Sequence, residues 1–376
     1  MAKVTPHEVK GIVDYNKLIR DFGCLEISHS QIDRLEKLTG RPAHRFLRRG
    51  IFFAHRDLDK IMDAYERKEP FYLYTGRGPS SESMHLGHMV PFIFTKYLQE
   101  VFDVNVVIQM TDDEKFLFRD LTLEQVREMT AKNIQEIIAF GFNPNKTFIF
   151  SNLAYVGTMY QNICRIQRCL SFNQVKGAFG FDDTNNIGKI GFPAIQAAPS
   201  FSSSFPHLFG ESSDILCLVP QAIDQDPYFR LTRDVARKLN LKVPAQIHSV
   251  FFPALGGPDS KMSSSDPSSG IFLSDTPQQI KKKINSKAYS GGGATLLEHQ
   301  KHGANLEVDV AFQLLKFFLE DDARLNEIAI EYSAGRRMSG EIKHLAIEVV
   351  QTLVHNHQLA VEQLTDDFIK LFTLVS

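Results

Sequence analysis

Two short stretches, far apart in the chain, carry residue types that suit chemistry on phosphate groups. The first, TGRGPSSESMHLGH, follows the apolar segment FYLY and ends with His85 and His88 on either side of Leu-Gly. If a helix begins just before Leu86, both imidazoles lie at its amino end, where free N–H groups and the helix dipole favour phosphate. Gly87 would leave a bare surface there for a flat group such as adenine. The simpler interpretation is a helix start that happens to contain two histidines.

The second stretch is KMSSS, which begins at Lys261 inside the segment GGPDSKMSSSDPSSG. Its glycine, proline and serine content predicts a mobile loop. One lysine with several hydroxyl groups on such a loop suits a departing pyrophosphate, because charge builds on the β- and γ-phosphates during displacement. A lone lysine beside serines is also common at a solvated loop tip, so this stretch alone decides nothing.

Alternating strands and helices are expected to position both stretches. The strand candidates are FYLYTG, VNVVIQM, KTFIFS, DILCLVP and PAQIHSVFFPAL. Helices are expected between them, one with a capping box at Thr122 and Gln125 and one with Asp226 as its N-cap. This alternation predicts a Rossmann-like α/β fold with a parallel sheet, helices on both faces, and ligands at the carboxyl ends of the strands.

Changes in sequence pattern and composition along the chain predict two domains. Residues 1–270 would form the sheet domain, with an extension over about 1–66 and an insertion over about 158–209 that is rich in Phe, Pro and Ser. From residue 271 to 376 the pattern is that of long amphipathic helices with no strand signal. We therefore expect an all-α C-terminal domain there.

Composition excludes several classes of protein. A net charge of −2 gives no global attraction to nucleic acid, so any polyanion would have to bind locally. The four cysteines form no CxxC pair, which argues against a zinc site and a disulfide framework. No apolar run is long enough to span a membrane, and MAKVTPHEVK does not look like a signal peptide. We expect a cytoplasmic protein with no membrane partner.

Taken together, HLGH and KMSSS resemble the paired signatures of class I aminoacyl-tRNA synthetases. Ser264 stands where the second signature carries another lysine, which leaves Lys261 as its only cation. Longer blocks narrow the match: IQMTDDEK, FNQVKGAFGF, FPAIQAAPSFSSSFP and AIDQDPYFRLTRDVA look like tryptophanyl-tRNA synthetases of the eukaryotic and archaeal type. That resemblance covers nearly the whole chain. It implies ATP-dependent formation of tryptophanyl-adenylate with release of pyrophosphate, followed by transfer to the 3′ adenosine of tRNA(Trp), with Mg²⁺ bridging the phosphates.

The resemblance also assigns residues. It implies catalytic roles for His85, His88 and Lys261. The residues that it places on ATP are Gly76, Arg77, Gly87, Lys115, Met262, Ser263 and Ser264. Those that it places on tryptophan are Tyr74, Gln109, Glu114, Gln196, Gln225 and Phe229. Tyr74 and Gln109 would meet the indole N–H, and Glu114 with the other two glutamines would hold the α-amino group. No metal ligand from the protein is expected, and Asp112 and Asp113 are interpreted as solvated or structural carboxylates.

Partners follow from the same resemblance. A homodimer is expected, with the insertion at 158–209 as its interface, although those aromatic side chains could equally line the protein's own core. The C-terminal helices would read the anticodon. Two basic runs, KKKINSK at 281–287 and HRFLRRG at 44–50, could contact tRNA or could be solvated helix faces.

Three alternatives remain open. A tyrosyl-tRNA synthetase shares the fold and both signatures, but AIDQDPYFR fits the tryptophan branch. A small-molecule adenylyltransferase would not need the long helical tail. A non-catalytic RNA-binding protein would be expected to have lost one of the two signatures, and both look chemically intact here.

Overall fold

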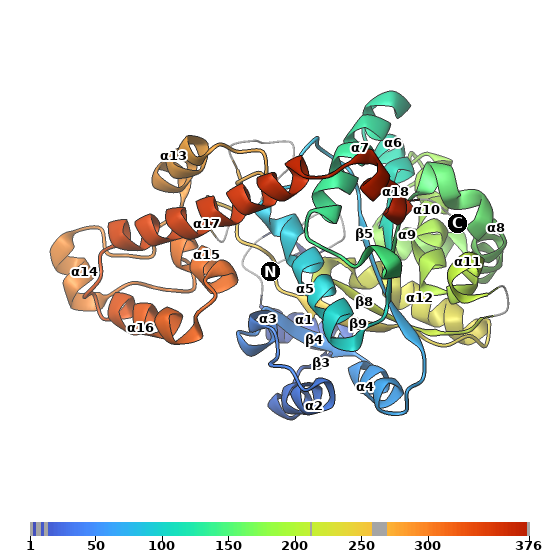
Figure 1. The fold of residues 1–376 in the computed structure, drawn as a ribbon, viewed down its shortest axis with the longest axis horizontal. Helices are drawn as coiled ribbons and strands as arrows, with labels where there is room; N and C mark the ends of the chain where they lie inside the picture. The colour runs from blue at the N-terminus through green and yellow to red at the C-terminus, as the bar shows by residue number, and fades with distance from the viewer. Residues whose placement is uncertain (1–2, 5–8, 11–13, 211–212, 258–268, 374–376) are drawn as a thin grey trace.

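The computed structural model describes residues 3–4, 9–10, 14–210, 213–257 and 269–373. Its main sheet has seven strands in the order β3-β4-β9-β8-β5-β6-β7 (Figure 1). A small two-stranded sheet, β1 (Lys3–Val4) with β2 (Val9–Lys10), lies apart from it. The strands of the main sheet are β3 (Leu25–Glu26), β4 (Phe52–Arg56), β5 (Phe71–Arg77), β6 (Asn105–Met110), β7 (Thr147–Ser151), β8 (Leu216–Ala222) and β9 (Ala245–Ser249).

The five strands β9, β8, β5, β6 and β7 pair in parallel, which confirms the predicted α/β architecture. Strand β5 lies between β6 and β8, so the chain leaves it on one side and returns much later on the other. Ligands bind at such a change of direction, outside the carboxyl ends of the strands. Gly76 and Gln109 are paired across β5 and β6 near this edge.

Two strands of the main sheet were not predicted. Strands β3 and β4, from the amino-terminal extension, add to the sheet in antiparallel orientation, with β4 paired to β9. The expected helices of that extension are present as α2 (His29–Thr39) and α4 (Leu58–Glu66). Strand β4 is short and pairs with a strand nearly two hundred residues later, a long-range contact that no local pattern reveals.

Side chains alternate between the two faces of the sheet, and each face has its own core. Leu73 and Ile108 point to the first face, which is covered by α2, α4, α5, α7 and the C-terminal helices. Tyr72 and Val107 point to the second face. The helices between β5 and β9 are α5 (Leu86–Phe102), α6 (Asp112–Phe118), α7 (Leu123–Ile138), α8 (Asn152–Cys169), α9 (Phe172–Phe179), α10 (Ile187–Ala197), α11 (Pro206–Phe209) and α12 (Asp226–Lys238).

The predicted insertion folds into α8 to α11 with two short 3₁₀ turns. Its phenylalanines are mostly core residues: Phe192, Phe201 and Phe205 are buried against the second face. The alternative that these aromatics line the protein's own core is therefore confirmed for these three. Tyr160 and Ile187, also in this region, remain exposed.

Beyond the sheet the described chain is helical, as expected. The long helix α17 runs from this helical part back to α7, and α18 packs beside β7 (Figure 1). The helices are α13 (Pro277–Lys287), α14 (Leu296–His302), α15 (Val310–Phe318), α16 (Asp322–Ser333), α17 (Ser339–Glu362) and α18 (Asp366–Thr373).

The basic run HRFLRRG joins the two halves of the molecule. It contains α3 (Arg45–Arg48). Arg45 donates to the carbonyl of Phe317 at 3.0 Å, and Arg48 and Arg49 both donate to the carboxylate of Asp322 at 2.7 Å. These guanidinium groups are committed to the C-terminal helices, which argues against a tRNA surface here.

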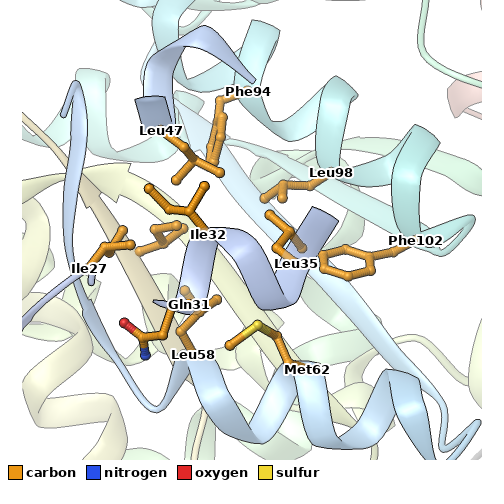
Figure 2. Close-up of a pocket in the computed structure, with 11 residues that line it drawn as sticks. Ile27, Gln31, Ile32, Leu35, Leu47, Leu58, Met62, Phe94, Leu98 and Phe102 are labelled. Atoms are coloured by element: carbon orange, nitrogen blue, oxygen red, sulfur yellow. The ribbon is translucent and has the colours of Figure 1, made fainter. Parts of the chain in front are cut away.

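A small apolar cavity lies under α2, between α4 and α5 (Figure 2). Its lining includes Leu35, Met62 and Phe94, and its volume is about 10 Å³. That is room for about one water molecule, and the apolar walls offer that water too few partners. The cavity is a packing void in the first core and not a ligand site.

Among the described helices, none is long and apolar enough to cross a membrane.

Candidate active site

Helix α5 begins where the histidine motif predicted it would. His85 is the N-cap residue and Leu86 the first helical residue. The rings of His85 and His88 stack with centroids 3.5 Å apart. The N–H of His85 approaches Nδ1 of His88 at 3.2 Å, which is the back-bonding arm of a capping box. The motif therefore caps its own helix as well as presenting two imidazoles at the sheet edge.

The amino end of α5 is less open than expected. The N–H of Leu86 donates to the carbonyl of Ile271 at 3.0 Å, and that of His88 donates to the carbonyl of His85 at 2.8 Å. The expectation of free N–H groups is wrong for these two. A Cβ added at Gly87 would lie 3.1 Å from the His85 ring and 3.2 Å from Cβ of Phe252. Protein atoms thus use the space that glycine leaves, and adenine could stack there only if one of them moved.

Arg77 ends β5 with a buried side chain. Its Nε donates to Oδ1 of Asn133 at 3.0 Å, and NH1 lies 3.0 Å from Nε2 of His88. Its NH2 has no hydrogen-bond partner among the described residues. Burial lowers the pKa of Arg77 to about 10, so the group stays charged at neutral pH. A buried cation with an unused donor suits a phosphate oxygen.

His88 receives two donors at once. Nδ1 faces the N–H of His85 and Nε2 faces Arg77. Because a neutral imidazole has only one accepting nitrogen, only one of these contacts can be a hydrogen bond at a time.

Helix α7 supplies two residues that the sequence reasoning missed. Asn133 and Glu136 lie three positions apart and are both buried. The carboxylate of Glu136 accepts from Ser83 Oγ at 2.6 Å and from the N–H of Met84 at 2.8 Å. Burial raises the pKa of Glu136 to about 7. Polar residues on the apolar face of an amphipathic helix, beside Met129 and Ile137, were the signal that could have found them.

On the second face, Tyr74 and Gln109 form a fully buried pair. The hydroxyl of Tyr74 lies 2.6 Å from Oε1 of Gln109 and 2.8 Å from the carbonyl of Gln196. Nε2 of Gln109 donates to Oδ1 of Asn152 at 2.8 Å, which fixes the orientation of the amide. The ring of Phe229 meets that of Tyr74 edge-on at 5.7 Å. The structure thus brings together four of the residues that resemblance placed on tryptophan.

Asp112 and Asp113 are structural rather than solvated. At the start of α6, Asp112 is buried and Asp113 is half-buried. Asp112 accepts from Ser151, and Asp113 accepts from Nδ2 of Asn152 at 2.7 Å. Burial raises the pKa of Asp113 to about 6. The hydrogen-bond chain from Tyr74 through Gln109 and Asn152 therefore ends on Asp113.

Glu114 and Lys115 form an ion pair between the two sides of the site. Nζ of Lys115 lies 2.9 Å from the Glu114 carboxylate, which also accepts from Thr111 Oγ1 at 2.9 Å. The pair crosses the loop after β5: a Cβ at Gly78 would lie only 2.2 Å from Cε of Lys115. The sequence placed these two residues on different substrates, and the structure puts them in contact with each other.

Gln225 lies at the carboxyl end of β8 and caps α12, which begins at Asp226. The predicted N-cap at Asp226 is therefore wrong by one residue. The reason is that the Asp226 carboxylate turns to Arg56, which donates to it at 2.9 and 3.1 Å. Cys24 and His248 also approach this carboxylate. Cys24, Asp226 and His248 are close enough together to resemble a set of metal ligands. The guanidinium of Arg56, however, already neutralises the Asp226 carboxylate.

The remaining predicted residues lie elsewhere. Lys261, Met262, Ser263 and Ser264 fall outside the residues that the structure describes. The described chain resumes at 269 and runs directly beside the histidine motif, where Phe272 pairs with His85 in antiparallel fashion. Residues 271–273, which follow the second motif in the chain, therefore lie against the first motif.

The site thus has two kinds of surface on the two faces of one sheet edge. On the first face a buried arginine and two histidines can bind an anion. On the second a closed network of neutral groups can bind a flat ring with one polar atom. The Glu114–Lys115 pair between them can meet an ammonium group on one side and a phosphate on the other.

Comparison with known proteins agrees with this arrangement. Residues 66–355 match the family model for tRNA synthetases class I (W and Y). The chain is 56% identical to a protein from Homo sapiens named cytoplasmic tryptophan–tRNA ligase, over 98% of this chain and 79% of that protein. It is 55% identical to the protein of the same name from Schizosaccharomyces pombe, over 98% and 96%.

Solved structures give the same result. Tryptophanyl-tRNA synthetase from Plasmodium falciparum superposes with a TM-score of 0.90 at 50% identity, covering 96% of this chain and 95% of that chain. The enzyme from Encephalitozoon cuniculi, solved bound to tryptophan, gives 0.89 at 44% identity, covering 96% and 98%. The family match spans well over half of the chain, and it extends from before β5 into α17. The chain belongs to the class I tRNA synthetases of the W and Y type.

Proposed function

We propose that this chain ligates L-tryptophan to tRNA(Trp) in two steps, in the cytoplasm as its named relatives do. The tryptophan carboxylate attacks the α-phosphate of ATP, forms tryptophanyl-adenylate and releases pyrophosphate. The terminal adenosine of the tRNA then attacks the activated carbonyl and AMP leaves. The first nucleophile is already ionised, so this step needs positioning and charge neutralisation more than a protein base.

The observation that carries the choice of tryptophan is the buried pair of Tyr74 and Gln109. Both side chains are fully buried, and both can accept a hydrogen bond from an indole N–H. A phenylalanine ring has no N–H to donate to this pair, so it would lack the hydrogen bond that an indole gains there. The ring of Phe229 packs edge-on against that of Tyr74 and would lie beside the indole. Glu114, Gln196 and Gln225 would hold the α-amino group.

On the nucleotide side, Arg77, His85 and His88 would bind the phosphates of ATP, and Gly76 and Gly87 lie beside them in the same two segments. Lys115 would neutralise the α-phosphate where the tryptophan carboxylate attacks. Lys261 and the Met262, Ser263 and Ser264 that follow it would bind the departing pyrophosphate.

We expect Mg²⁺ to be held mainly by the phosphates themselves. Mg²⁺ commonly binds through substrate phosphates and water, with few protein carboxylates. The described side chains on the nucleotide side are mostly cations and neutral donors, which fits this mode. The ion would spread the negative charge of the β- and γ-phosphates while Arg77 and Lys115 orient the α-phosphate.

For tRNA we propose the helical region from 271 to 376 as the anticodon-binding domain, with 1–270 as the catalytic domain. On α13, Lys281, Lys282 and Lys287 are exposed and available to phosphates, whereas Lys283 pairs with Asp275 at 2.7 Å. We also propose a homodimer through the insertion at about 158–209, supported by exposed apolar side chains there. Tyr160, Phe172 and Ile187 are 60%, 48% and 85% exposed.

Pyrophosphate exchange tests the function directly. Purified protein is incubated with ATP, Mg²⁺ and labelled pyrophosphate, with tryptophan, tyrosine or phenylalanine in parallel. We expect exchange with tryptophan alone. Exchange with tyrosine would favour the other branch of the family. No exchange with any amino acid would favour a non-catalytic protein.

A further inference from the structure

The backbone that enters the histidine motif is held by a second chain segment. The N–H of Leu273 donates to the carbonyl of Met84 at 2.8 Å, and the N–H of Leu86 donates to the carbonyl of Ile271 at 3.0 Å. These two bonds flank His85 and make residues 84–86 and 271–273 a short antiparallel pair. His85 therefore takes its position from both segments.

Helix α7 holds this pair. Glu136 accepts from the N–H of Met84, the residue before His85, and from the hydroxyl of Ser83. One turn earlier, Asn133 donates to the carbonyl of Ser81 at 3.0 Å and accepts from Arg77. Both side chains are buried, so these bonds are shielded from water and cannot be exchanged for solvent at no cost.

Helix α17 also holds this pair. Nε2 of Gln358 donates to the carbonyl of Leu273 at 2.7 Å and to that of Asp275 at 3.2 Å. Asp275 in turn accepts from the N–H of Phe272 at 2.8 Å and pairs with Lys283. A side chain in the C-terminal helical region is thus two hydrogen bonds away from Met84.

We propose that Glu136 and Gln358 are positioning residues for the nucleotide half of the reaction, because they hold residues 84–86 and 271–273 to helices α7 and α17. The proposal rests on the proposed function. Neither residue touches the tryptophan side, because Tyr74 and Gln109 lie on the opposite face of the sheet. Loosening these bonds displaces His85 and His88 and leaves the indole contacts in place.

Helix α17 provides its own control. Gln351 lies seven residues before Gln358 on the same helix, and its Nε2 donates to the carbonyl of Pro277 at 2.7 Å. It makes the same kind of bond to the start of α13, outside the segment that pairs with residues 84–86. Gln358→Met and Gln351→Met both remove one amide and keep the side-chain volume close to the original.

The test measures the KM for ATP and the KM for tryptophan separately in pyrophosphate exchange, with thermal unfolding of each variant. We expect Gln358→Met to raise the KM for ATP about fivefold and to leave the KM for tryptophan unchanged, while Gln351→Met changes neither. Glu136→Gln keeps the shape but loses one of two acceptors, and we expect a rise in the KM for ATP of about tenfold.

Three results would overturn the proposal: equal rises in both KM values, equal effects of the two glutamine variants, or no effect of Gln358→Met and Glu136→Gln in folded protein. An inactive wild type would instead refute the proposed function. If Glu136→Gln does not fold, Gln358→Met alone still decides, because the side chain is only partly buried and lies on a surface-facing helix.

Discussion

The side of the sheet edge that we propose for tryptophan and the side that we propose for the nucleotide satisfy their polar groups in opposite ways. On the tryptophan side, Tyr74, Gln109 and Asn152 bond to one another and are neutral. On the nucleotide side, buried Arg77 carries a charge and an NH2 without a hydrogen-bond partner among the described residues. On the tryptophan side the polar side chains already have hydrogen-bond partners in one another. On the nucleotide side the charge of Arg77 suits an anionic ligand. The neutral network suits an uncharged ring, and the buried cation suits a polyanion.

The largest effect is expected from Arg77→Gln. Loss of the charge should lower kcat/KM for ATP in pyrophosphate exchange by about a hundredfold, because such a donor acts where charge develops. Tryptophan binding, measured by equilibrium dialysis without ATP, should change less than about twofold, since no contact of Arg77 reaches that side. An equal loss for both substrates would mean that the two halves are not separate.

Gln109→Ala tests the other half. It removes a buried acceptor and leaves the Tyr74 hydroxyl and the Asn152 amide with fewer partners. We expect the KM for tryptophan to rise about thirtyfold, and the KM for ATP to change far less. The same exchange assay with each substrate varied in turn measures both. A rise of similar size for ATP would contradict the role of Gln109 in tryptophan binding.

A change at Asp226, whose carboxylate contacts Arg56 and not a proposed substrate, should affect stability and neither KM. Asp226→Asn breaks the buried pair with Arg56, and we expect it to lower the free energy of unfolding by about 3 kcal/mol. Urea unfolding measures that loss, and exchange kinetics at a temperature where the variant is folded should match the wild type. Altered KM values in folded protein would show that this pair reaches the site.

The same pair sets a dependence on pH. Burial raises the pKa of Asp226, but bonds from His248 and Arg56 outweigh it and lower the pKa from 3.8 to about 2. The native state therefore favours the ionised form, and its contribution of about 2 kcal/mol is present above pH 4 and is lost as pH falls toward 2. The unfolding free energy of Asp226→Asn should fall less steeply over that interval.

Local patterns predicted much of this molecule and failed where partners are distant in sequence. The parallel strands, the capping box at Thr122 and the start of α5 all follow from contacts within a few residues. The antiparallel strand β4 and the bond between Arg56 and Asp226 join positions nearly two hundred residues apart. No periodicity reports such pairs, which is why β4 was missed and the N-cap of α12 was misplaced.

Contacts between residues distant in sequence also limited what could be predicted of the candidate active site. Resemblance named Tyr74, Gln109 and Arg77, because their blocks are long and specific. It did not name Asn133 or Glu136, which touch backbone rather than substrate and have no motif of their own. Buried polar residues on apolar helix faces indicate that a partner exists, but only the fold identifies it.

Gly78 carries a last consequence. Lys115 passes through the volume that any β carbon at this position would occupy, so even a methyl group would push the ammonium away from Glu114. Residue 78 lies on a loop whose sequence could otherwise drift freely. The absence of a side chain there leaves room for the lysine that we propose to stand between amino acid and nucleotide.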